Sequence, residues 1–259
     1  LNTINIETDM FKWSTNLNIT TTKNEITELT QESFINGTKR WEVGTSLYEF
    51  FLREYAGVDS SNGKALWFKD ILDAEGEETG EKTTTDVYAD ATRYSTGKES
   101  LPDFQGGITN TFIYGDFDLN VLMNFSVGAY VYDSTYAGLM GSFETLGSGS
   151  SVDISNRWQK PGDITNVPRL QNSQNDFNAS STRFLFKNDY LRLKALTLGY
   201  NVPTNKIENI GLSRLRLYFQ GDNLVTFQSH KGIDPEQSLA GTNRSFNQRI
   251  FSLGVNLEF

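Results

Sequence analysis

Alternation of apolar and polar side chains is clearest at the end of the chain, over residues 246–259. Successive side chains of a strand point to opposite faces, so one face of this stretch is apolar and the other is small or polar. The apolar face holds Phe251, Leu253, Val255, Leu257 and Phe259. A soluble sandwich strand can show this pattern. A terminal aromatic residue is more typical of a bacterial outer-membrane barrel, in which lipid contacts one face and a wet lumen the other.

The same period of two extends over residues 117–131, with Val121 and Phe125 on one face and Asn120 and Asn124 on the other. A strand of this length exceeds the usual soluble strand and suits a tilted membrane strand with an extension above the bilayer. The apolar phase slips near Lys194 and Ala195, which predicts a β-bulge there. Seven further strands are predicted, over residues 1–8, 11–20, 47–57, 64–69, 104–114, 189–202 and 212–227.

The predicted joins between these strands alternate between short and long. Short joins lie near 9–12, 58–63, 115–116 and 203–211, and long loops lie near 23–46, 71–103, 132–188 and 228–245. Long loops count against a compact soluble domain, whereas outer-membrane barrels have short periplasmic turns and long extracellular loops. The pattern gives about nine strands, and because single-chain barrels have an even number, we expect a part of a larger barrel.

Composition narrows the class of protein. Of the 259 residues, 37% are hydrophobic, and the mean hydropathy is −0.45. The sequence contains no run of about 18 apolar residues, so no transmembrane helix is predicted. The 18 Phe, 11 Tyr and 4 Trp suit the aromatic girdles of a barrel. The absence of Cys excludes disulfides and thiolate chemistry. A net charge of −9 argues against nucleic acid as a partner.

No enzyme constellation is present in the sequence, and no cofactor is predicted. His230 is the only His and Cys is absent, so a zinc site lacks ligands, and no Ser-His-Asp triad is predicted around the single His. We interpret His230 as a surface loop residue. The run from Gly147 to Ser151 is interpreted as a flexible loop rather than a phosphate cradle. The acidic run from Asp73 to Glu81 could hold Ca²⁺, but its spacing matches no calcium loop, so a solvated acidic loop is expected.

Several segments, in order along nearly the whole chain, resemble the C-terminal region of the SusC-like TonB-dependent transporters of the Bacteroidetes outer membrane. These segments are Trp13–Ile19, Tyr55–Asp59, Leu101–Phe112, Phe117–Leu122, Asn156–Trp158, Asp189–Tyr200, Leu215–Phe227, Gly232–Glu236 and Phe251–Phe259. Two positions depart from the family pattern: Ala195 stands where Asn is common, and Asn247-Gln-Arg249 stands where a Pro-Arg pair often precedes the last strand.

The resemblance implies an all-β fold, a transmembrane antiparallel β-barrel of about 22 strands, of which residues 1–259 would supply the last nine or so. The first strands, a plug domain and a TonB-binding segment would lie upstream in the same polypeptide. A SusD-like surface lipoprotein would cap the extracellular mouth. TonB would supply the energy for importing oligosaccharides or oligopeptides across the outer membrane, without enzymatic chemistry. Phe259 would belong to the terminal signal that the barrel-assembly machinery reads.

Candidate contact residues follow from this arrangement. Tyr136, Phe143 and Trp158 in the long loop could stack on sugar rings or pack against the lipoprotein, although packing of the loop against its neighbours is the simpler interpretation. Four side chains would face the lumen and contact the plug or line the path: Arg214, Arg216, Gln220 and Asp222.

Two rival interpretations remain open from the sequence. One is a different membrane barrel, such as a passive porin or a surface adhesin, which a plug domain and a TonB segment upstream would exclude. The other is a soluble all-β domain that binds or cleaves glycans, which would stay in solution without detergent.

Overall fold

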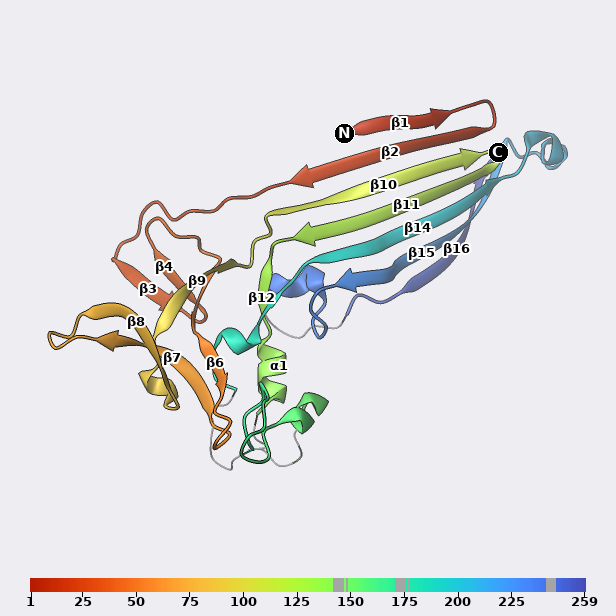
Figure 1. Ribbon diagram of the computed structural model, residues 1–259. Helices are drawn as coiled ribbons and strands as arrows, with labels where there is room; N and C mark the ends of the chain where they lie inside the picture. The colour runs from red at the N-terminus through yellow and green to blue at the C-terminus, as the bar shows by residue number, and fades with distance from the viewer. Residues whose placement is uncertain (142–146, 148, 171–175, 177, 241–245) are drawn as a thin grey trace.

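Seven long antiparallel strands form one curved sheet, which we call the wall. The computed structural model describes residues 1–141, 147, 149–170, 176, 178–240 and 246–259. In spatial order the wall strands are β1 (Asn2–Glu7), β2 (Phe11–Thr20), β10 (Phe104–Tyr114), β11 (Phe117–Val127), β14 (Tyr190–Asn201), β15 (Arg214–Gln228) and β16 (Ile250–Glu258). The sheet is open, with β1 and β16 as its edges (Figure 1).

The wall has an apolar face and a polar face because its strands are paired in matching phase. One row across six strands contains only apolar groups: Trp13, Phe112, Leu119, Leu198, Phe219 and Leu253. The next row, on the opposite face, contains only polar groups: Ser14, Thr111, Asn120, Thr197, Gln220 and Ser252. We call these the outer and the inner face, by analogy with a barrel in lipid.

The predicted bulge at Lys194 is confirmed. Leu122 pairs with Ala195 whereas Met123 pairs with Leu193, so Lys194 is the extra residue of β14. The pairing of β14 with β15 shifts at the same point. Because a bulge inserts one unpaired residue, Leu193 and Leu196 both stay on the outer face despite their odd spacing.

The number of predicted membrane strands is corrected from nine to seven. Residues 47–57 and 64–69 do not join the wall. They form β5 (Glu49–Arg53), β6 (Tyr55–Val58) and β7 (Ala65–Leu72) of two smaller sheets. They are rich in aromatic side chains, as a wall strand is, but Phe50 and Phe51 are adjacent, as are Trp67 and Phe68, so the strict alternation of a wall strand is absent. The wall therefore runs directly from β2 to β10, and the chain between them forms a separate structure beyond one end of the wall (Figure 1).

Three segments predicted as loops contain regular elements. Between β2 and β10 lie β3 (Ser33–Asn36), β4 (Lys39–Glu42), β8 (Glu78–Thr85), the 3₁₀ turn η1 (Tyr88–Asp90) and β9 (Arg93–Glu99). The acidic run from Asp73 to Glu81 forms the turn of the β7–β8 hairpin and the first half of β8. Between β11 and β14 lie β12 (Tyr130–Tyr132), α1 (Ser134–Leu139), η2 (Val152–Asn156), η3 (Thr182–Phe184) and β13 (Leu185–Lys187).

Two further details of the predicted strands are corrected. The strand predicted over 117–131 ends at Val127, because Gly128 adopts a φ of 95° that breaks the extended backbone. In β1, the register shifts between Ile4 and Ile6, so these two side chains do not share a face as predicted. The remaining turns are η4 (Thr204–Lys206) and η5 (Glu208–Ile210) after β14, and η6 (Pro235–Ala240) after β15.

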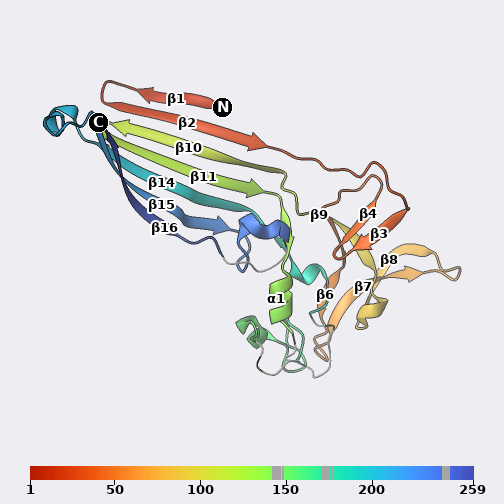
Figure 2. The same cartoon turned by 180° about the vertical axis from the view of Figure 1, so that it is seen from behind.

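The two long excursions, residues 21–103 and 128–189, pack together into one structure that we call the loop body. Phe50 and Leu52 of the first excursion share a buried cluster with Leu185 of the second. The hydroxyl of Tyr88 donates a hydrogen bond of 2.8 Å to the carbonyl oxygen of Ser180. Seen from behind, the loop body again lies beyond the end of the wall that is opposite to the C-terminus (Figure 2). Among the described residues, no helix is long and apolar enough to cross a membrane.

Candidate functional site

The predicted lumen residues of β15 all lie on the inner face, but most of them are paired within the wall. Arg216 forms two hydrogen bonds with Asp118 of β11, Nε to Oδ1 at 3.1 Å and Nη2 to Oδ2 at 2.5 Å. The pair reaches across Gly199 of β14, where a Cβ would overlap both side chains. Arg216 therefore connects β15 to β11 across the glycine.

The other predicted lumen residues make more local contacts. Arg214 forms an exposed ion pair of 3.2 Å with Glu258 of β16. Gln220 donates a hydrogen bond of 3.0 Å to the Asp222 carboxylate on the same strand. Contact of these side chains with a plug or a substrate stays a prediction.

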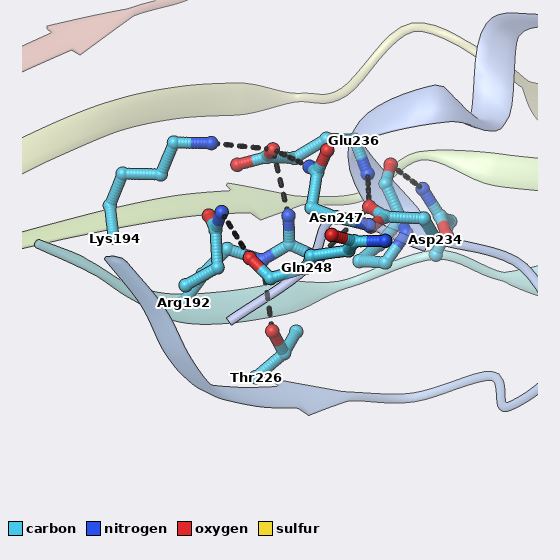
Figure 3. A network of polar contacts seen from close by, with 10 residues as sticks. Arg192, Lys194, Thr226, Asp234, Glu236, Asn247 and Gln248 are labelled. Atoms are coloured by element: carbon cyan, nitrogen blue, oxygen red, sulfur yellow. Dashed lines mark hydrogen bonds and ion pairs between the residues drawn. The ribbon is translucent and has the colours of Figure 1, made fainter. Parts of the chain in front are cut away.

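A buried ionic network on the inner face involves Arg192 of β14 and the loop that follows β15 (Figure 3). Arg192 is 3% exposed; its Nη2 lies 2.9 Å from Oδ1 of Asp234, and its Nη1 lies 2.8 Å from Oε2 of Glu236. Lys194, the bulge residue, is 2.9 Å from the same glutamate oxygen. Arg192 Nε also donates a hydrogen bond of 2.9 Å to Thr226 Oγ1 on β15. Two cations thus face two carboxylates, which satisfies charges that would otherwise be costly to bury.

Asn247 completes this network from the other side. Its backbone N–H donates to Asp234 Oδ2 at 2.9 Å, and its side-chain amide donates to Glu236 Oε2 at 2.8 Å. Asn247 belongs to the segment Asn247-Gln-Arg249, which departs from the family pattern. At this position it donates one hydrogen bond to each of the two acids. The alternation of β14 puts Arg192 on the inner face, but nothing in the sequence pairs it with a loop more than forty residues away.

The interpretation of His230 as a surface residue is wrong. Its ring stacks on Phe186 with centroids 4.0 Å apart, and Nε2 lies 2.9 Å from Oδ2 of Asp133. Asp133 is 1% exposed and caps α1 by accepting a hydrogen bond of 2.8 Å from the Tyr136 backbone N–H. The His230 side chain is 11% exposed. His230 therefore fixes the loop after β15 to the loop body. Its neighbours in the sequence, Ser229 and Lys231, are polar and gave no indication of this role.

Of the three aromatic residues predicted to contact substrate or a lid, two are described. The Tyr136 hydroxyl donates to Asp153 Oδ2 at 2.8 Å, and its ring packs edge-on against Phe184 and Phe186. Burial, together with the Asp153 carboxylate, raises the pKa of Tyr136 to about 12. Phe143 lies outside the described residues.

Trp158 joins the two excursions of the loop body. Its Nε1 donates a hydrogen bond of 3.0 Å to the carbonyl oxygen of Ser60, and its ring covers Gly63, where a Cβ would overlap the indole. Both described aromatic residues thus have packing partners within the loop body. Their contact with a substrate or a lid stays a prediction, as does the role of Phe259, which follows β16 and is 92% exposed.

A polar cavity of about 610 Å³ lies where the loop body meets the wall. Its lining comes from the segments after β2 and β4, from β9 and from the junction of β11 with β12, and includes Asn24, Ser46, Glu99, Asp103 and Tyr130. Glu99 accepts a hydrogen bond of 2.8 Å from Ser46 Oγ, and Leu47 N–H donates to Asn24 Oδ1 at 2.9 Å. Within the part of the chain that the structure describes, no group of three or more His, Asp or Glu side chains is placed to hold a metal ion.

The chain is similar over its full length to curated TonB-dependent receptors of Formosa agariphila. TonB-dependent receptor P3 is 29% identical over 297 aligned residues, and TonB-dependent receptor P26 is 25% identical over 285, with 100% of this chain covered in each case. The chain spans about 28% of the length of these relatives. No family model matches the chain.

Solved structures give the same result at the level of the fold. The RagAB peptide transporter superimposes with a TM-score of 0.82 at 24% identity, and the RagAB peptide importer in its open-open state with 0.76 at 26%. Each superposition includes 100% of this chain and 28% of the transporter chain that it matches. The wall therefore has the fold of part of a TonB-dependent transporter barrel, which confirms the predicted fold class, and the predicted resemblance to this family and the outer-membrane location are confirmed with it.

Proposed function

We propose that residues 1–259 form the C-terminal part of the outer-membrane barrel of a SusC-like, TonB-dependent importer. The observation that carries the proposal is that the wall has an apolar outer face and a polar inner face. The whole chain, of which the wall is a part, is similar to such proteins. The first strands, the plug and the TonB-binding segment would come from the rest of the same polypeptide. Transport by this assembly requires a wall and a gate rather than bond chemistry.

The substrates would be oligomeric nutrients, either oligopeptides or oligosaccharides, held between the loop body and a SusD-like surface lipoprotein. The matched structures are described as a peptide transporter and importer, which supports the oligopeptide alternative. The amide- and hydroxyl-rich inner face suits either class, because Asn, Gln, Ser and Thr side chains donate to and accept from peptide and sugar groups alike. TonB would couple import to the proton motive force of the inner membrane.

Uptake by intact cells tests the proposal. The gene that carries this chain is deleted, and depletion of oligopeptide and oligosaccharide mixtures from the medium is followed by mass spectrometry with and without a protonophore. We expect the deletion and the protonophore to abolish depletion of the same set of compounds. Depletion that persists with the protonophore but is lost in the deletion strain would indicate a passive porin instead. Mass spectrometry of the purified complex then identifies the lipoprotein and any bound oligomer.

A further inference from the structure

The loop between β15 and β16 touches both the wall and the loop body. We call residues 229–240 the bracket loop. Toward the wall it offers Asp234 and Glu236, which pair with Arg192 and Lys194 of β14. These contacts lie on the inner face, since Arg192 occupies the same row as Asn124 and Thr226. The bracket loop therefore rests against the polar side of the wall, and Figure 3 shows the paired side chains.

Toward the loop body the bracket loop makes a second set of contacts. Its first residue, Ser229, donates through Oγ to the carbonyl oxygen of Lys187 at 2.7 Å. His230 stacks on Phe186 and contacts Asp133, and Gly232 packs close to the same carboxylate. These three residues thus hold both ends of the segment between β11 and β14, which begins near Asp133 and returns near Lys187.

The centre of the bracket loop is buried between these two sets of contacts. Ile233 is 2% exposed and Asp234 is 1% exposed. The carbonyl oxygen of Pro235 accepts a hydrogen bond of 3.1 Å from the Asn188 side chain, another buried group. A loop that ended in solvent would leave these groups exposed. Its sequence, with Asp234 and Glu236 flanking a proline, would otherwise favour an exposed turn.

We infer that the bracket loop is a fixed brace on the inner face, and that Arg192 is a positioning residue which, through this loop, holds the loop body in place at the end of the wall. Removing one partner of a buried, hydrogen-bonded ion pair is far more disruptive than removing a surface pair. The brace therefore stays docked during thermal motion, and the part of the loop body that it holds does not move independently of the wall. The inference concerns the position of the loop body relative to the wall. Its relevance to import rests on the proposed function.

Cysteine accessibility tests the brace, because the chain has no Cys of its own. The complete polypeptide that carries this chain, with any cysteines outside it replaced, receives a single reporter, Ile233→Cys in the bracket loop or Val131→Cys in β12. Both native side chains are buried, at 2% and 1% exposure. Labelling by a membrane-impermeant maleimide is then timed on intact cells, without any substrate.

Asp234→Asn is the test substitution, since it removes a charge and keeps the shape. Asp118→Asn is the matched control, because Asp118 also pairs with an arginine on the inner face but contacts no part of the bracket loop. We expect slow labelling in the parent, about 100-fold faster labelling of both reporters with Asp234→Asn, and no change with Asp118→Asn. Arg192→Lys, which keeps the charge but loses the planar fork, should give an intermediate rate. Heat-modifiability on gels verifies that each variant has assembled.

Three outcomes would overturn the inference. The Ile233→Cys reporter could label rapidly in the parent, the control could match the test substitution, or Asp234→Asn could expose Ile233→Cys while Val131→Cys stays protected. The last result would show a flap that moves by itself. Because labelling is measured without substrate, a failure of the import experiment leaves this test intact, and a failure of the brace leaves the import experiment intact.

Discussion

The wall and the loop body both contain antiparallel sheets, yet they bury different groups. Among the described residues, every buried apolar side chain lies outside the seven wall strands. The loop body holds Trp67, Leu52 and Phe184, each at most 2% exposed. Buried positions of the wall include Ser126 and Arg192 on its polar face, while Leu253 on its outer face is 86% exposed.

The difference shows which solvent each region is built for. A soluble structure buries its apolar side chains against one another, as the loop body does. The wall instead presents them outward in rows, which is stable only against lipid. Inner polar side chains such as Asn120 with Thr111 and Arg216 with Asp118 form hydrogen bonds between strands. Polar groups on the outer face follow the same rule: Asn110 accepts from Trp13 Nε1 at 2.9 Å and from Thr15 Oγ1 at 2.8 Å. The variants below test whether the two regions are stabilised independently.

The largest expected effect is on the core of the loop body. Trp67→Ala should destabilise that region by about 3–5 kcal/mol, because it removes the largest fully buried side chain from the cluster with Ala65 and Ala91. Limited proteolysis of residues 33–99 measures the loss, and heat-modifiability should show a normally assembled barrel. Val87→Ala, at a side chain that is 48% exposed, is the control and should change little. Loss of barrel assembly in Trp67→Ala would contradict the independence of the two regions.

The two faces of the wall can be separated on a single strand. Val121→Arg on the outer face should impair assembly, since a cation in the middle of the bilayer costs about 2–4 kcal/mol. Phe125→Arg should act in the same direction. Asn120→Arg and Asn124→Arg, on the inner face of the same strand, should be tolerated better. The fraction of heat-modifiable protein in outer-membrane preparations measures each effect, and equal losses on both faces would reverse the assigned orientation.

A smaller effect is expected where Trp158 crosses between the excursions of the loop body. Gly63 has a φ of 77° and its Cα is covered by the indole, so Gly63→Ala adds overlap to backbone strain, and overpacking of this kind costs about 1–3 kcal/mol. Gly37→Ala is the matched control: its φ is 61°, but nothing lies within 4 Å of the added carbon. Protease resistance of the loop body should fall more for Gly63→Ala. An equal fall would leave strain as the sole cause.

The smallest effect is a pH dependence confined to the loop body. Burial lowers the pKa of Lys39 to about 8, against partial compensation by Glu99 and Glu49. Its ammonium contacts the Phe50 ring at 3.4 Å. The unfolded chain binds more protons than the folded one between pH 8 and the ordinary lysine pKa, so stability should rise with pH in that window. Lys39→Met should remove this rise, as measured by proteolysis at a series of pH values.

The tyrosines of the loop body set the upper end of that window. Burial raises the pKa of Tyr55 and of Tyr94 to about 12. These groups stay protonated in the folded state while the unfolded chain begins to lose protons near pH 10, so stability should fall above that pH. A rise and then a fall is expected for the parent, and only the fall for Lys39→Met. A fall beginning at pH 8 would contradict the assigned environment of Lys39.

The sequence by itself determined which side chains share a face along most of the wall strands, although not how many of the predicted strands belong to the wall. Alternation from Phe117 to Val127 and from Ile250 to Glu258 requires no partner to be recognised, because side-chain direction in a strand is a local property. The phase slip at Lys194 predicted the bulge for the same reason. The sequence also excluded enzyme chemistry that needs Cys or a second His.

Tertiary structure decided everything that depends on which segments meet. The segments that form β5 and β7 were predicted as barrel strands. In the structure β5 pairs with β9 and β7 pairs with β8, because partner choice depends on packing across many residues. Arg192 was predictable as an inner-face side chain, but Asp234 and Glu236 reach it from a loop whose fold no local pattern describes. His230 likewise had no sequence signal for burial, since its partners Asp133 and Phe186 are distant in the chain and are brought to it only by the folded loop body.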